Sequence, residues 1–306
     1  MRSTGIPTAA QRTIRETRRA VALEGRSFWR SPATAVIAVV AAPFLLGARA
    51  QAHDFWIEPS SHRPAPGTAV GVTLRVGSRD DSVTYPRNPA HLERFVLARE
   101  DMAIPVAGET GDDPAGRIVV PSPGPWWLGY RSQVTLVALD ARKFEDYLRD
   151  EGLENALETR AELAETGRPT VEMFSRFAKA LLWAGVPTDD LRARSAITTP
   201  LGFTLELVPE QDPSAIRPER ELPVRLLFNG APLAGALVDA TRMAAPGHAI
   251  ARRTDASGRV SLPLAHAGVW MLAAVHMQRV TGPARATWES WWASLTFELG
   301  EGRRSR

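Results

Sequence analysis

The chain has 306 residues, no cysteine, 37 Lys and Arg, 34 Asp and Glu, and a formal net charge of +3. The lack of cysteine excludes a disulfide framework, thiolate zinc sites and iron–sulfur clusters. Residues 1–52 hold eight Arg and two Glu and contribute +6, so the rest of the chain carries −3 and no nucleic-acid partner is expected.

An apolar run at residues 33–46 follows an arginine-rich segment and is shorter than the roughly 20 residues of a membrane-spanning helix. This pattern predicts a signal peptide over residues 1–52 and a periplasmic or secreted protein. Two small-x-small triplets offer cleavage after either Ala50 or Ala52, and the pattern leaves both open. A cut after Ala52 would make His53 the terminal residue, whose free amine and ring could together chelate one metal ion.

Residues 53–209 are predicted to form a β-sandwich with a helical insertion at about residues 141–195. Alternating apolar residues and turn formers predict short strands at 69–76, 94–98, 117–120, 133–139 and 203–208. The insertion is expected to hold one helical stretch at 141–163, interrupted at Gly152, and a second at 171–184. The second rests on an apolar stripe at helical spacing, formed by Met173, Phe177, Ala180, Leu181 and Ala184.

Pro209-Glu210-Gln211-Asp212-Pro213 is the predicted domain boundary. Residues 210–300 are expected to form a small immunoglobulin-like sandwich of about seven strands, followed by a tail at 301–306. Asn229-Gly230 between apolar runs predicts a hairpin turn. The predicted fold class is therefore all-β, with two immunoglobulin-like β-sandwich domains and a helical insertion between strands.

The sequence also resembles a known family through an ordered set of motifs. They are His53 to Pro59 (HDFWIEP), Tyr85 to His91 (YPRNPAH), Lys143 to Leu148 (KFEDYL), Glu151 to Leu153 (EGL) and Trp288 to Phe297 (WESWWASLTF). In these it resembles the DUF4198 family, which implies a periplasmic component associated with nickel or cobalt uptake and a membrane transporter as partner. The C-terminal half resembles carboxypeptidase-regulatory and transthyretin-like modules through Gly230 to Val238 and Thr254 to Gly258.

Histidines are the candidate metal ligands, because imidazole is the commonest side-chain ligand for late divalent ions. His53 is the first candidate, and His62 or His276 is expected to complete the site. His62 lies nine positions after His53 in a loop and is equally compatible with a solvated residue. His276 ends an apolar strand, where a hydrogen-bonded core histidine is the alternative. The other three, His91, His248 and His266, are interpreted as turn or surface residues.

Glu289 is the fourth candidate ligand. In an unbroken strand it shares a face with Trp291, Leu295 and Phe297, which predicts burial with a metal or cationic partner. A β-bulge that turns the side chain outward is the alternative.

The sequence contains no nucleophile elbow, HExxH, Walker loop or Rossmann fingerprint, so no enzymatic activity is predicted. The leading hypothesis is an exported protein that binds or delivers nickel, cobalt or copper. The alternatives are a structural or adhesive envelope module that binds no metal, and a copper redox enzyme with a terminal-histidine brace, for which no second brace histidine is evident.

Overall fold

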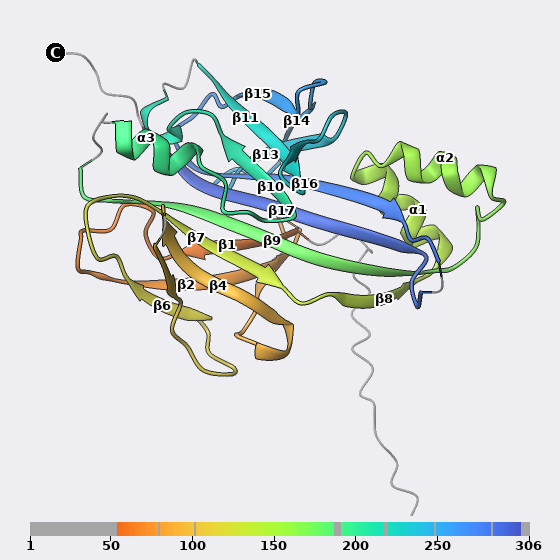
Figure 1. Ribbon diagram of the computed structural model, residues 1–306, viewed down its shortest axis with the longest axis horizontal. Coiled ribbons are helices and arrows are strands. Elements are labelled where there is room, and N and C mark those ends of the chain that lie inside the picture. Colours follow the sequence, from red (N-terminus) through yellow and green to blue (C-terminus); the bar gives the residue numbers. More distant parts are fainter. Residues whose placement is uncertain are drawn as a thin grey trace, which may run out of the picture. The chain divides into compact units, whose positions relative to one another are not determined.

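The computed structural model describes residues 54–300, except residues 79, 101, 187–190, 217–219, 248 and 283. The predicted signal peptide and His53 lie outside the described residues. Strands dominate the described chain, which confirms the predicted all-β class (Figure 1). Among the described residues, no helix is long and apolar enough to cross a membrane.

Nine of the described strands form one large sheet that takes strands from both halves of the chain. In spatial order they are β14 (Ile250–Arg253), β13 (Leu237–Arg242), β16 (Gly268–Arg279), β17 (Trp288–Leu299), β9 (Thr170–Ala184), β7 (Gly124–Ser132), β4 (Leu92–Arg99) and β5 (Met102–Pro105), with β8 (Thr135–Leu139) pairing with β9. Strands β17 and β9 pair in parallel at the centre, and every other pairing is antiparallel.

Two smaller sheets cover opposite faces of the large one. One contains β1 (Asp54–Pro59), β2 (Ala69–Gly77), β3 (Ser82–Thr84) and β6 (Gly116–Val119). The other contains β10 (Leu205–Pro209), β11 (Glu221–Phe228), β12 (Ala231–Pro232) and β15 (Arg259–Pro263). Each encloses its own apolar core, because even-numbered residues of β9 such as Ala178 join the β1 side and odd-numbered ones such as Phe177 join the β10 side.

The predicted boundary near residue 209 falls inside one smaller sheet, because β10 precedes it and pairs with β11 after it, and the large sheet also takes strands from both sides. Hydrogen bonds tie the layers together: Ser294 Oγ of β17 donates to the carbonyl of Phe55 (2.7 Å), and Thr296 Oγ1 donates to that of Ile57 (2.8 Å). These bonds place β1 on the side of β17 that faces away from β10.

Helices α1 (Ala141–Asp150) and α2 (Glu154–Glu162) confirm the predicted helical stretch. Asp140 caps α1 by accepting from the backbone amide of Lys143 (2.9 Å), and Gly152, at φ 63°, separates the two helices. The pair packs on Val275, Met277 and Trp288 of the large sheet. The described chain also holds α3 (Leu191–Thr198) and the 3₁₀ turns η1 (Pro89–His91) and η2 (Pro213–Ala215).

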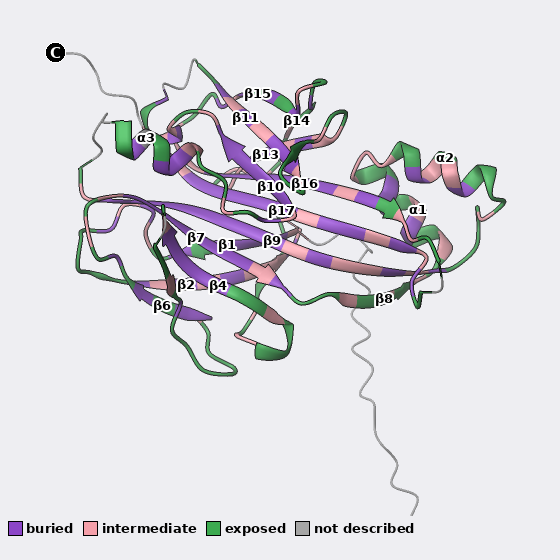
Figure 2. Cartoon of the chain, in the orientation of Figure 1, coloured by how far each residue is buried: buried purple, intermediate pink, exposed green. Residues whose placement is uncertain are grey.

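The second predicted helix, at 171–184, is wrong, because this segment is the central strand β9. From Phe177 to Ala184 every residue is buried (Figure 2). A strand covered on both faces has apolar residues on both of them, so it lacks a regular apolar–polar alternation and its apolar residues also fit a helical stripe. The region 141–195 is consequently a helical pair followed by the middle of the sheet.

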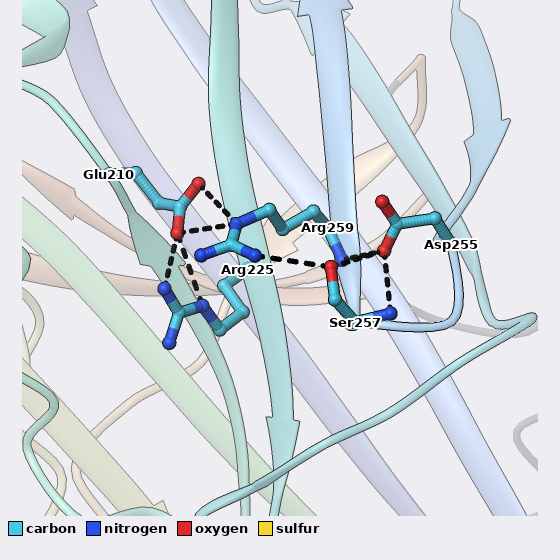
Figure 3. A network of polar contacts seen from close by, with 5 residues as sticks. All are labelled: Glu210, Arg225, Asp255, Ser257 and Arg259. Carbon is cyan, nitrogen blue, oxygen red and sulfur yellow. Dashed lines mark hydrogen bonds and ion pairs between the residues drawn. The ribbon is translucent and has the colours of Figure 1, made fainter.

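The turn at Asn229-Gly230 confirms the predicted hairpin, since both residues have positive φ (52° and 78°) between β11 and β12. On the neighbouring pair, Arg225 of β11 faces Arg259 of β15, and both guanidiniums bind Glu210 (Figure 3). Burial alone would raise the pKa of Glu210, but the hydrogen bonds from both arginines outweigh it and lower the pKa. All three charged side chains are thus paired, and they link β11 and β15 on the surface of the sheet that contains β10.

Candidate functional site

Two predicted ligands, His276 and Glu289, lie on the same face of the large sheet. His276 pairs with Trp291 across β16 and β17, and Gln278 pairs with Glu289. Directly opposed residues and residues two apart along a strand share a face, so these four side chains project to one side. Diagonal neighbours have Cα atoms about 7–8 Å apart, within reach of long side chains. The structure therefore places His276 and Glu289 as diagonal neighbours on one face of the sheet.

The same register continues over two more strands. Glu289 pairs with Met173 of β9, and Met173 pairs with Leu136 of β8, so Gln278, Glu289, Met173 and Leu136 form one row across the sheet. We call these four residues the open shelf, together with His276, which lies two residues before Gln278 on β16 and closer to the core. Gln278 and Leu136 are exposed and the other three are half-buried, and Figure 2 shows the buried colour of β9 giving way to intermediate towards β8.

The open shelf begins where the β10–β15 layer ends. Phe228, the last residue of β11, contacts the rings of His276 (4.5 Å between centroids) and Trp291 (4.8 Å). Trp291 belongs to the core beneath that layer, whereas Glu289, two residues earlier, is only half-buried. Glu289 therefore lies on the predicted face of β17, without a β-bulge. Its predicted burial is wrong, because the β10–β15 layer covers the pair of His276 and Trp291 but ends before the pair of Gln278 and Glu289.

The charge states of His276 and Glu289 are those in which both side chains can bind a metal ion. Burial lowers the pKa of His276, which favours the neutral ring, and the Gln278 amide lies 3.1 Å from Nε2 of that ring. Desolvation raises the pKa of Glu289, whose carboxylate has no hydrogen bond or ion pair within the described chain. The expected cationic partner from the protein is therefore missing there. A neutral imidazole, a carboxylate and the thioether of Met173 are all ligand types for transition metals.

These three ligands are too few to enclose a metal ion completely. Within the described residues, no group of three or more His, Asp or Glu side chains gathers at one place. The shelf offers one nitrogen, one carboxylate and one sulfur ligand, which fits an ion that keeps further positions open.

His62 lies far from the shelf. Its ring is 7 % exposed, and Nδ1 is 2.8 Å from the carbonyl of Leu181 on β9. Leu181 is six residues beyond Ser175, the β9 residue level with Trp291 and His276, which corresponds to about 20 Å along the strand. The interpretation of His62 as a solvated loop residue is wrong, and burial lowers its pKa. It cannot share an ion with His276 in this fold.

His53 lies outside the described residues, but the strand that follows it is described. The ring of Phe55 belongs to the core on the β1 side of the sheet, whereas His276 contacts the core on the β10 side. A site that joins His53 to His276 would have to reach around the sheet.

The remaining histidines match their turn and surface interpretations where they are described. His91 ends the η1 turn, capped by Asn88, and His266 is exposed. His248 lies outside the described residues.

A second polar cluster lies on the opposite face of the same strands and was missed in the sequence. Glu172 of β9, which is 3 % exposed, accepts hydrogen bonds from Tyr147 of α1 (3.1 Å) and from Ser290 of β17. Ser290 in turn accepts from Nε1 of Trp292 (3.0 Å). Burial raises the pKa of Glu172 to about 7, against the lowering effect of the two hydroxyl groups.

Arg176 lies four residues after Glu172 on β9 and therefore projects from the same face of the sheet. Its guanidinium lies 5.2 Å from the ring centroid of Phe55 and 5.0 Å from that of Phe174. We call Arg176, Glu172, Ser290, Trp292 and Tyr147 the polar seam, since they lie where the β1 sheet and the α1–α2 pair meet on one face. Because β9 was expected to be a helix, the alternation that places Glu172 and Arg176 together was not recognisable.

Comparison with protein families gives one match. A family model described as a domain of unknown function, DUF4198, matches residues 50–278. This range includes His276, His62 and the whole of β9, and ends before Glu289. A search of curated proteins found no significant match. Since the matched range covers most of the chain, the protein belongs to the DUF4198 family.

Proposed function

We propose that the protein is an exported binding protein for a divalent transition metal ion, which it holds on the open shelf and passes to a membrane component. The observation that carries the proposal is the juxtaposition of His276, Glu289 and Met173 on three adjacent strands, with the carboxylate unpaired within the described chain. A half-desolvated carboxylate is stabilised by a nearby cation, and a neutral ring is the form that ligates.

The open coordination supports delivery better than storage. Three protein ligands on a half-exposed sheet face leave positions for water or for the ligands of a receiving protein. The shelf is also reached without opening the core, since Gln278 and Leu136 at its ends are exposed. Nickel, cobalt and copper all accept this donor set, and in the test tube copper would bind most tightly whatever ion the cell supplies.

Calorimetry on the exported protein tests this proposal. Wild type should bind one equivalent of Cu(II) or Ni(II), and His276→Ala and Glu289→Gln should each weaken binding by about ten-fold or more. His266→Ala is the matched control, because this histidine is exposed and lies outside the shelf. Binding should weaken only at a pH below the ordinary histidine pKa of 6.5, because burial lowers the pKa of His276 and the neutral ring is the form that ligates.

Two outcomes would redirect the proposal. Loss of binding on adding one alanine before a terminal His53, with His276→Ala unaffected, would move the site to the amino terminus. Absence of binding by wild type at micromolar metal would favour the structural envelope module that binds no metal.

A further inference from the structure

Arg176 is a half-buried cation that forms no ion pair in the described chain. Its Nε is inaccessible to solvent and has no hydrogen-bond acceptor in the described chain, and no carboxylate there lies within ion-pair distance of its guanidinium. The other arginine on an aromatic ring nearby, Arg279 over Trp288, is held by both oxygens of Glu165 at 2.7 Å. Burying an unpaired charge is costly, so the seam is incomplete as it stands.

The surroundings of Arg176 define the shape of what is missing. The guanidinium lies over the rings of Phe55 and Phe174, and Tyr85, Tyr130 and Glu172 lie close enough to influence its charge. Tyr130 donates to the carbonyl of His91 (3.2 Å), and burial raises the pKa of both tyrosines, so their hydroxyls stay neutral. Below pH 7, where the carboxyl group of Glu172 is mostly protonated, the site therefore offers one positive charge, neutral hydroxyls and aromatic walls.

Access from solvent remains at this point. Tyr85, Phe174, Arg176 and Trp292 are all half-buried, although Glu172 beside them is almost fully buried. The stack of Trp292 on Tyr147 (5.3 Å, 22°) forms the edge of the seam on the helical side.

We propose that the polar seam binds a small monocarboxylate with an apolar body, whose carboxylate pairs with the guanidinium of Arg176. A single guanidinium matches a single carboxylate in a bidentate pair. A phosphate dianion would need more positive charge than the described seam supplies, whereas apolar atoms of a carboxylic acid would pack on the aromatic walls. This site lies on the face of the sheet opposite the open shelf and does not depend on metal binding.

Titration calorimetry of the mature protein with benzoate tests this, in chelator at about pH 6, where Glu172 is mostly protonated. We expect one binding site, with phosphate binding at least about ten-fold more weakly than benzoate. Arg176→Gln should weaken benzoate binding about ten-fold or more, and Arg176→Lys, which keeps the charge, about three-fold.

Arg131→Gln is the matched control. Arg131 lies one strand away over Phe177, on the opposite face, and already pairs with Glu93 (2.9 Å). Its loss should change benzoate affinity less than about two-fold. Melting curves verify folding, and Arg176→Lys carries the test if Arg176→Gln does not fold.

Three results would overturn the inference. They are no benzoate binding by wild type up to about 10 mM, equal affinity in wild type and the Arg176 variants, and phosphate binding as tight as that of benzoate. His276→Ala should bind benzoate like wild type, so failure of the metal site and failure of this site are distinguishable.

Discussion

Strand β9 places a cation on each of its faces, the buried Lys179 and the half-buried Arg176, and the two differ in how completely they are paired. Lys179 lies 2.7 Å from Glu206, whose carboxylate also accepts from the backbone amides of Leu201, Gly202 and Phe203. The guanidinium of Arg176, three residues earlier on the other face, lies over two aromatic rings and has no ion pair in the described chain. A saturated pair is explained by the fold alone, whereas a buried donor without an acceptor requires a further explanation, which for Arg176 we propose to be a bound carboxylate.

The same contrast separates the carboxylates. Glu206 is saturated by a cation and three amides, Glu172 is bound only by neutral hydroxyls, and Glu289 has no partner in the described chain. The loss of stability on substitution should decrease in this order, because removing one member of a buried pair leaves the other member as an unpaired buried charge.

Lys179→Met should have the largest effect on stability. It leaves the carboxylate of Glu206 buried without its cation and should lower the free energy of unfolding by about 3–5 kcal/mol. Chemical denaturation measures this, and the double variant Lys179→Met/Glu206→Gln should recover part of the loss. A single-variant loss below about 1 kcal/mol would show that the three backbone amides suffice.

Glu172 should make stability depend on pH. Its folded-state pKa of about 7 lies above the ordinary value of 4.5, so its contribution is fully present below pH 4.5 and is lost as the pH rises through 7. The loss amounts to about 3 kcal/mol between these limits. Glu172→Gln should flatten this part of the stability profile. An identical profile in the variant would contradict the raised pKa.

His276→Ala should cost about 1 kcal/mol of stability. The ring contacts Phe228 at 4.5 Å and stacks near Trp291 at 5.8 Å, but it is only half-buried. Thermal unfolding without metal measures this contribution. A loss as large as that of Lys179→Met would mean that His276 is a core residue and would weaken its assignment as a ligand.

Glu289→Gln should have the smallest effect without metal, within about 0.5 kcal/mol, since no charge pair of the described chain is broken. The sequence pattern alone predicts a loss of several kcal/mol, from a buried pair. Denaturation in chelator distinguishes the two. A large loss would reveal a partner outside the described residues.

The sequence predicted the β class, the α1–α2 pair, the Asn229-Gly230 hairpin and the face of Glu289, because alternation, a glycine break and turn chemistry are local signals. It did not reveal β9, since a strand buried on both faces lacks alternation. It also could not show that the β10–β15 layer ends at Phe228, which decides the exposure of Glu289. The polar seam could not be predicted either, because Tyr147, Glu172 and Ser290 are distant in sequence and meet only through the sheet register.

The most direct test of the metal-binding account is the electron paramagnetic resonance spectrum of the protein with one equivalent of Cu(II). We expect nitrogen hyperfine coupling from one imidazole, which disappears in His276→Ala and persists in His266→Ala. A copper spectrum unchanged by His276→Ala would contradict the account, because the open shelf offers no other histidine among its five residues.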